Sequence, residues 1–248
     1  MNEQANSALL EEHEVLFLDF LGFGSAVKHW DDDRMERLIT VLVKIAEAQS
    51  AFNITGKPQS DGSYKITTQP EITTFSDNLV VSCPIPAKPA EIVGDVREVV
   101  ANGWDGMVRE HMQNITAQIV MAALDVGLLV RGGLSRGRLY HDGRVVVGEA
   151  MVDAYCLEKK VALYPRVVVS ERISDNNRLY TDTDDVRCLD YISAMMLLAD
   201  HRRGNARVWA QDRLGEIENT INALKEGKHK AKWVYFKNNL CHALETWC

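Results

Sequence analysis

EVLFLDFLGF, residues 14–23, is the stretch around which the fold of this chain is organised. The apolar run from Val15 to Leu18 is short, continuous and rich in β-forming residues, which is typical of a buried strand. Asp19 ends that run, and a carboxylate there is costly to bury unless it is paired or bound to a metal. Gly22 and Gly24 follow at once, so the chain can turn tightly with its backbone N–H groups facing a ligand.

Residues 25–30 are expected to open a helix whose N-terminus favours anions. Strand, acid, glycine-rich turn and helix together indicate a metal–phosphate site. The alternative is an ordinary strand and turn in which Asp19 caps the helix, since short motifs often match by chance.

Composition limits the class of protein. The chain has 248 residues, 46% apolar and 25% charged, which is typical of a globular protein with one large domain or one domain and an appendage. A net charge of -7 argues against nucleic-acid binding, because phosphate contacts need clustered Lys and Arg. No stretch approaches the ~20 apolar residues of a membrane span. We therefore expect neither nucleic acid nor membrane as a partner.

The cysteines and the N-terminal residues indicate the compartment. Five cysteines lie scattered without a C-x-x-C pair, which favours a reducing cytoplasm over a disulfide framework or a zinc site. Residues 1–14 are polar and acidic and lack the basic segment and apolar core of a signal peptide. We expect a cytoplasmic protein.

A second acid lies in a turn farther along the chain. The extended pieces 64–73 and 78–82 are joined by Thr74-Phe75-Ser76-Asp77, and Ser-Asp-Asn is favourable turn chemistry. The pattern predicts a hairpin with Asp77 at its tip.

Residues 127–148 predict another hairpin, around the Asp142-Gly143 pair. Arg131, Arg136 and Arg138 lie in it among glycines, and at alternating spacing Arg136 and Arg138 share one face. On an exposed strand they would form a solvated face. Where the neighbouring glycines let a ligand come close, the arginines could instead bind phosphate oxygens bidentately.

Most of the remaining chain shows helical periodicity. Helices are expected at residues 35–46, 91–126, 149–162, 191–200 and 211–247, the last with a break at Gly227, and a strand at residues 166–170.

This order of elements resembles the catalytic domain of class III nucleotide cyclases over about residues 14–170. In that family a strand ends in Asp, followed by an apolar residue, any residue, Gly and Phe, as in Asp19–Phe23 here. A second Asp lies on the next hairpin, as in Phe75-Ser76-Asp77. The resemblance implies an α+β fold: a ferredoxin-like cyclase sheet flanked by helices, with a helical C-terminal extension. It divides the chain into an arm (1–13), a catalytic domain (14–190) and the extension (191–248).

More narrowly, the chain is similar to the bacterial pyrimidine nucleotide cyclases of the Pycsar antiphage system, through residues 130–137 and 148–158. Purine cyclases carry an Asn and, four residues on, an Arg that supports the transition state. Aligned on Leu157-Glu158, those places hold Val152 and Cys156, and neither can donate to a phosphate. The Lys that commonly reads adenine, four residues before the second Asp, is Thr73 here.

The resemblance implies cyclisation of UTP to 3′,5′-cyclic UMP and pyrophosphate, with CTP as the alternative substrate. Two Mn²⁺ or Mg²⁺ ions per site would be held by Asp19, Asp77 and the Phe20 carbonyl. Backbone amides of Leu21, Gly22, Phe23 and Gly24 would cradle the β- and γ-phosphates.

Two further roles are implied for side chains. Arg131 or Arg136 would stabilise charge on the transferring phosphate, with a structural salt bridge as the alternative for each. Tyr64 or Thr73 would contact the base.

The family also implies a head-to-tail homodimer with its sites at the interface, and a second-messenger role in antiphage defence. Three alternatives stay open. The chain could be a degenerate cyclase fold that binds nucleotide without catalysis, a purine cyclase with unusual base recognition, or an unrelated α/β scaffold.

Overall fold

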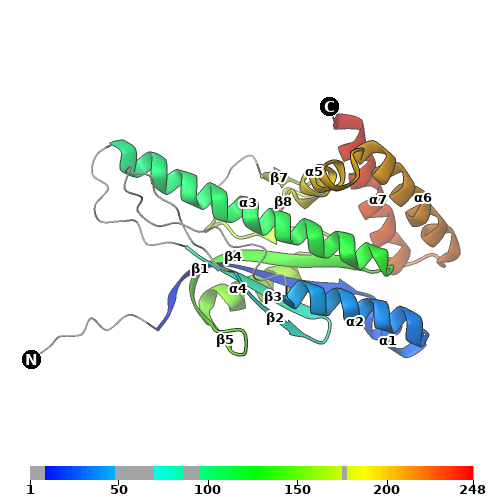
Figure 1. The fold of residues 1–248 in the computed structure, drawn as a ribbon, viewed down its shortest axis with the longest axis horizontal. Helices are drawn as coiled ribbons and strands as arrows, with labels where there is room; N and C mark the ends of the chain where they lie inside the picture. Colours follow the sequence, from blue (N-terminus) through cyan, green and yellow to red (C-terminus); the bar gives the residue numbers. More distant parts are fainter. Residues whose placement is uncertain (1–8, 48–69, 86–94, 175–177, 248) are drawn as a thin grey trace, which may run out of the picture.

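The computed structural model describes residues 9–47, 70–85, 95–174 and 178–247. One sheet lies between helices, and α5, α6 and α7 pack together beside it at the right of Figure 1. The predicted α+β fold, a sheet flanked by helices with a helical C-terminal segment, is confirmed. Among the described helices, none is both long enough and apolar enough to cross a bilayer.

The strands are β1 (Glu11–Leu21), β2 (Glu71–Phe75), β3 (Asn78–Pro84), β4 (Leu129–His141), β5 (Val146–Gly148), β6 (Val167–Val169), β7 (Leu179–Thr181) and β8 (Arg187–Leu189). The helices are α1 (Phe23–His29), α2 (Asp32–Glu47), α3 (Asp95–Asp125), α4 (Glu149–Lys160), α5 (Tyr191–Arg203), α6 (Ala206–Ala223) and α7 (Lys228–Thr246).

The sheet has the strand order β2-β3-β1-β4-β6-β8-β7, with β5 paired to β4. β1 runs antiparallel to both β3 and β4, and β2 runs antiparallel to β3. With α1 and α2 between β1 and β2, and α3 between β3 and β4, this part has the β-α-β-β-α-β arrangement of ferredoxin-like folds. The ferredoxin-like sheet is therefore confirmed by its topology.

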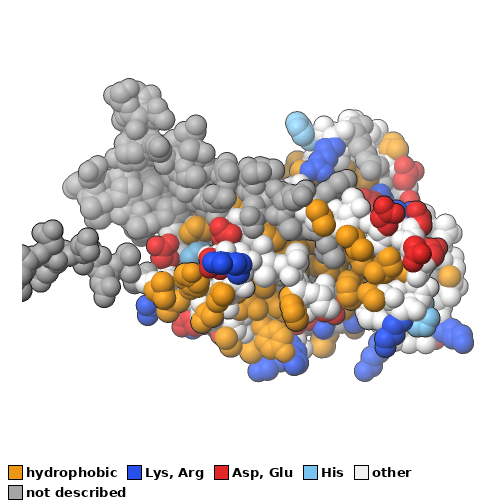
Figure 2. Space-filling view, turned by 60° about the horizontal axis from the view of Figure 1, so that its bottom comes forward, with side chains coloured by type: hydrophobic (Ala, Val, Ile, Leu, Met, Phe, Trp, Pro, Cys, Tyr) orange, Lys and Arg blue, Asp and Glu red, His pale blue; other side chains and the backbone are white. Residues whose placement is uncertain are grey.

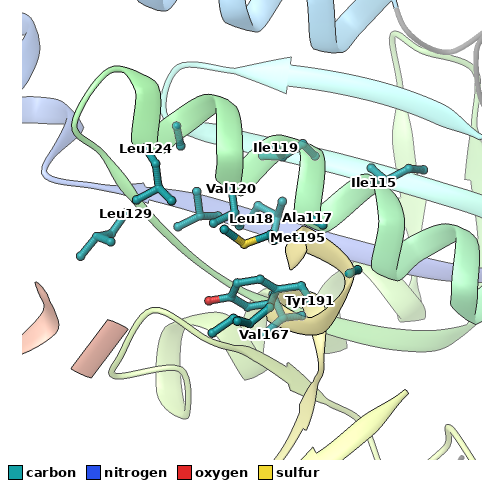
Figure 3. Packing of buried hydrophobic residues seen from close by; sticks show 14 of the residues in the cluster. Leu18, Ile115, Ala117, Ile119, Val120, Leu124, Leu129, Val167, Tyr191 and Met195 are labelled. Carbon is teal, nitrogen blue, oxygen red and sulfur yellow. The ribbon is translucent and has the colours of Figure 1, made fainter. Parts of the chain in front are cut away.

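Alternate side chains of β1 face two different layers. Leu16, Leu18 and Phe20 enter the large core with α3 and α5, whereas Val15 and Phe17 join the smaller cluster with α4. Figure 3 shows the large core, where Val120 of α3 lies near Leu18. Full burial of such side chains contributes about 1.5–3 kcal/mol each.

α4 lies close against β4 because the strand has a glycine at the contact. A Cβ on Gly133 would stand 2.1 Å from the Ala154 carbonyl oxygen, so any side chain there would push the helix away. This close packing holds α4 over the face of the sheet to which Asp19 belongs.

A buried ion pair ties β1 to α3. Arg109 Nε lies 3.2 and 3.0 Å from the two carboxylate oxygens of Glu14, and Arg109 Nη1 donates to the Ser174 carbonyl at 3.2 Å. The side chains of Glu14 and Arg109 are 0% and 1% exposed. Pairing is what makes these charges tolerable there, since an isolated buried charge is very costly.

Element boundaries differ from expectation at a few places. β1 begins at Glu11, because its pairing with β3 and β4 continues before residue 14. The expected strand at 64–73 is described only from Glu71, and residues 64–69 lie outside the described chain. α6 begins at Ala206 rather than 211, because the Asn205 side chain accepts the Val208 N–H and caps it. The break at Gly227 is confirmed.

The C-terminal helices share the large core with the sheet. Trp209, Trp233, Phe236 and Leu240 are buried in the same cluster as Leu18. The division of the chain at 190/191 into separate units stays a prediction.

Candidate active site

A tight turn connects β1 to α1. Gly22 has φ 90° and ψ 0°, a left-handed conformation that favours glycine. Its carbonyl accepts the Ser25 and Ala26 N–H groups at 3.1 and 3.0 Å. At Gly24, no described atom lies within 4 Å of where a side chain would begin. The turn therefore leaves space beside its backbone.

The two predicted metal-binding acids lie at the same end of neighbouring strands. Asp19 on β1 is directly opposite Asn78 on β3, and Phe20 N–H donates to the Asp77 carbonyl at 3.0 Å. Asp77 sits in the β2–β3 turn, where its Oδ1 accepts from Asn78 Nδ2 at 3.0 Å. The register thus brings together two acids that are far apart in the sequence.

Arg131 joins Asp19 to a third acid. It lies opposite Asp19 on β4, and its Nε donates to Asp19 Oδ2 at 2.9 Å. Its Nη2 lies 2.6 Å from Oε1 of Glu158 on α4, and its Nη1 donates to the Ala162 carbonyl at 3.3 Å. One guanidinium therefore bridges two carboxylates, in a site where the Asp19 and Glu158 side chains are 17% and 5% exposed.

The cluster carries more negative than positive charge. Burial raises the pKa of Glu158, and the charges of Asp19 and Asp77 raise it further, whereas Arg131 acts to lower it. Because both aspartates act on Glu158, the three acids form one electrostatic group. Such a group favours binding of a cation or protonation of one member.

The donor set suits a hard divalent ion. Within the described chain, Asp19 Oδ1 accepts no hydrogen bond, so one oxygen is available beside the Arg131 contact. Mg²⁺ and Mn²⁺ prefer oxygen ligands, and Mg²⁺ usually takes only one or two carboxylates plus water and phosphate oxygens. Among the described residues, no group of three or more His, Cys, Asp or Glu side chains is arranged to hold a metal alone. An ion here would therefore depend on substrate oxygens or water.

Arg136 is not brought to this cluster. It pairs with Glu14, five residues along β1 from Asp19, which is about 17 Å along a strand. Side chains alternate between the two faces of a sheet along each strand. Arg136 is five residues from Arg131 on β4, so it lies on the opposite face of the sheet from Asp19. There its Nε donates to Glu12 Oε1 at 3.0 Å.

Thr73 lies on the same face as Asp19, but its hydroxyl is engaged by the β4–β5 hairpin. Its Oγ1 donates to the Gly143 carbonyl at 2.9 Å and therefore accepts from His141 Nε2 at 2.8 Å. His141 Nδ1 then accepts from Ser82 Oγ at 2.8 Å. Burial lowers the pKa of His141 to about 4, which matches this neutral ring. Tyr64, the other residue expected at the base, lies outside the described residues.

No protein-family model matches the sequence, and no curated protein matches it. Among solved structures, the chain is similar to the guanylate cyclase domain of RhGC from Catenaria anguillulae in complex with GTP (13% identity, TM-score 0.42, 72% of this chain and 93% of that chain). It is also similar to the adenylyl cyclase CyaB from P. aeruginosa (15%, 0.37, 72% and 92%). A third is a bacterial light-regulated adenylyl cyclase (12%, 0.38, 76% and 56%). Similarity at this level says nothing about the reaction or substrate of this chain.

Sequence reasoning missed the residues that α7 brings to the site. His229 Cε1 would lie 3.3 Å from a Cβ on Gly22, and the charge of Lys232 interacts with those of Asp19 and Glu158. Both residues belong to the basic stretch KEGKHKAK, residues 225–232. This run of basic residues is visible in the sequence. The residues around it do not indicate that it packs against the Gly22 turn, which lies near the other end of the chain.

Proposed function

We propose that this protein is a nucleotide cyclase acting on a pyrimidine ribonucleoside triphosphate, with UTP favoured. The observation that carries the proposal is the placement of Asp19 and Asp77 at the ends of adjacent strands, beside the glycine turn that connects β1 to α1. In the reaction, the ribose 3′-oxygen forms a bond to the α-phosphorus and loses its proton. The bond from that phosphorus to the bridging oxygen breaks, pyrophosphate leaves, and the 3′,5′-cyclic nucleotide remains.

Asp19, Asp77 and the Phe20 carbonyl would hold two Mg²⁺ or Mn²⁺ ions. When bound, these ions lower the pKa of the 3′-hydroxyl and balance charge on the leaving pyrophosphate. The amides of Leu21, Gly22, Phe23 and Gly24 then orient the β- and γ-phosphates by donating hydrogen bonds.

Of the two arginines, Arg131 is the better candidate for stabilising negative charge on the α-phosphate. It already contacts Asp19, whereas Arg136 lies on the other face of the sheet. A phosphate oxygen that replaces one carboxylate contact would receive a charge-assisted hydrogen bond from the same guanidinium.

Preference for a pyrimidine rests on the resemblance and on the absence of a lysine at Thr73. Because the Thr73 hydroxyl is already bonded to Gly143 and His141, contact with a base would require it to exchange one of these bonds. The role as an antiphage second-messenger synthase rests on the resemblance alone.

An exposed apolar surface supports the proposed homodimer. Figure 2 shows hydrophobic side chains gathered on the face that includes the bottom of Figure 1, where α4 and β5 lie. Phe75, Val147 and Val152 are 77%, 58% and 59% exposed. Apolar side chains gathered on one exposed face commonly mark a protein interface. In the proposed dimer, a second copy covers it and completes the site.

The test is incubation of the protein with UTP, CTP, ATP or GTP, each with Mn²⁺ or Mg²⁺, followed by chromatography of the products. Cyclic UMP is the expected product. Cyclic CMP would assign the alternative pyrimidine, and a cyclic purine nucleotide would refute the base preference.

A second candidate is a protein that binds nucleotide without catalysis. Val152 and Cys156 favour it, because neither side chain can donate to a phosphate as the family's Asn and Arg do. Triphosphate binding with no cyclic product from any of the four nucleotides would support this candidate and refute the cyclase.

A further inference from the structure

The first turns of α7 bring basic side chains to the Gly22 turn. α7 begins at Lys228, after Gly227 has reversed the chain with φ 147°. Lys228 and Lys232 are four residues apart and therefore share a helix face, and His229 lies beside them. His229 Cε1 would stand 3.3 Å from a Cβ on Gly22, which fixes α7 directly over the turn.

Lys232 lies three residues after His229 on α7, and therefore on the same face of the helix, within electrostatic range of the acidic cluster. Its charge interacts with Asp19 and Glu158, and with the like charges of Arg131 and Lys228, while burial lowers its pKa. Yet within the described chain Lys232 forms no salt bridge or hydrogen bond, unlike Lys230 and Lys237 of the same helix. Lys230 Nζ lies 2.6 Å from Glu226 Oε1, and Lys237 Nζ lies 2.6 Å from Glu218 Oε1. Lys232 is thus a half-buried ammonium with its donors available.

A cavity of about 390 Å³ is lined in part by His229. Gly22, Ser25, His29, Arg34 and His229 contribute to its wall, and none of the described residues that line it carries a carboxylate. Arg34 is held in place there: it donates to the Val126 carbonyl at 3.3 and 3.1 Å, and its guanidinium carbon lies 4.3 Å from the Trp30 ring centroid. A cavity with these donors and no acid suits an anion.

We propose that α7 supplies the side chains that bind the triphosphate, with His229 beside the Gly22 turn and Lys232 on the next turn of the same helix face. The identity of the anion as a nucleoside triphosphate rests on the proposed function. A bound triphosphate needs cationic donors, and few are present among the described residues of the other elements around the site. Val152 and Cys156 leave no phosphate donor at the two α4 positions where the family carries Asn and Arg, and Asp19 and Glu158 share the one guanidinium of Arg131. A triphosphate at this site therefore requires further cations, and Lys232 is positioned to provide one.

The experiment compares Lys232→Gln and His229→Gln with Lys230→Gln, a change of the same kind on the same helix. The first readout is calorimetric binding of inorganic tripolyphosphate with Mg²⁺, which needs no turnover. Lys232→Gln is expected to weaken binding at least tenfold, His229→Gln by a smaller factor, and Lys230→Gln less than twofold. Lys232→Arg should retain most of the binding, which separates loss of charge from misfolding. Circular dichroism and the melting temperature check that each variant is folded.

The second readout is KM and kcat for the nucleotide that the protein cyclises. Lys232→Gln is expected to raise KM at least as much as it weakens tripolyphosphate binding. Equal binding by Lys232→Gln and the parent, or no tripolyphosphate binding by the parent, would overturn the proposal. If the parent binds tripolyphosphate through Lys232 but forms no cyclic product, the assignment of α7 holds and the cyclase activity fails. If cyclic product forms normally in Lys232→Gln, the cyclase holds and the assignment of α7 fails.

Discussion

Arg131 stands directly across the sheet from Asp19, with its Nε 2.9 Å from Asp19 Oδ2, and the same guanidinium reaches Glu158. The positions of the Asp19, Arg131 and Glu158 side chains are therefore linked. A change at any one of these three residues alters the charge that the other two experience.

Replacement of either aspartate is expected to abolish turnover. Asp19→Ala and Asp77→Ala each remove a carboxylate from the proposed metal site, and we expect product formation to fall at least a thousandfold. Asp33→Asn is the control, since Asp33 pairs with Arg37 in an exposed salt bridge that contributes little to stability. Product formation at the parent rate by either alanine variant would contradict the metal assignment, provided that circular dichroism shows it folded.

Replacement of Arg131 is expected to lower kcat much more than replacement of Arg136. Arg131→Gln should lower kcat by about a hundredfold or more, because it removes a charged donor at the site. Arg136→Gln should change kcat less than threefold, because Arg136 is on the opposite face of the sheet and paired with Glu12. Steady-state kinetics of both variants provides the measurement, and an Arg136 effect as large as that of Arg131 would refute this ranking.

Gly22→Ala is expected to destabilise the protein, whereas Gly24→Ala should not. An alanine at φ 90° costs about 1–2 kcal/mol, and its Cβ would press against His229. Gly24 lies within α1 with open space around it, so alanine there should be neutral or slightly stabilising. Urea denaturation of the two variants tests the difference, and equal midpoints would show that the Gly22 turn is not strained by a side chain.

The buried pair between Glu14 and Arg109 is expected to show strong coupling. Glu14→Leu or Arg109→Met alone leaves a buried charge without its partner and should cost about 3–5 kcal/mol of unfolding free energy. The double variant Glu14→Leu/Arg109→Met should recover a large part of that loss. A double-mutant cycle by denaturant unfolding gives the coupling, and strictly additive losses would contradict it.

Acid is expected to destabilise the fold through buried histidines. Burial lowers the pKa of both His111 and His141 to about 4, from 6.5 in the unfolded chain. Between pH 6.5 and 4 the unfolded state therefore binds more protons than the folded state, so stability falls as the pH falls. His141→Gln should make the melting temperature less dependent on pH over this range. An unchanged pH dependence in that variant would show that His141 does not titrate in this way.

Local chemistry explains which features were predictable. The apolar run before Asp19, the glycine at 22 and the Ser-Asp-Asn turn each act over a few residues, so their strands and turns follow from the sequence. Within β4, alternation placed Arg136 and Arg138 on one face, but the choice between Arg131 and Arg136 depends on register with β1. That register joins residues 112 positions apart, which no local pattern determines.

The same reason explains why Lys232 and His229 were missed. Their basic stretch is visible in the sequence, but its position over the Gly22 turn depends on how α7 packs in the core. Helix packing of this kind is set by side-chain fit between distant elements rather than by periodicity. Tertiary contacts, more than the local pattern, therefore decide which cations belong to the site.

Because Phe236 and Leu240 share a core with Leu18, the wall that His229 adds to the Gly22 turn exists only once α7 has packed. A ribosome makes the aspartates and the turn early and α7 late. During synthesis, a nascent chain would therefore hold both carboxylates long before α7 could cover the Gly22 turn.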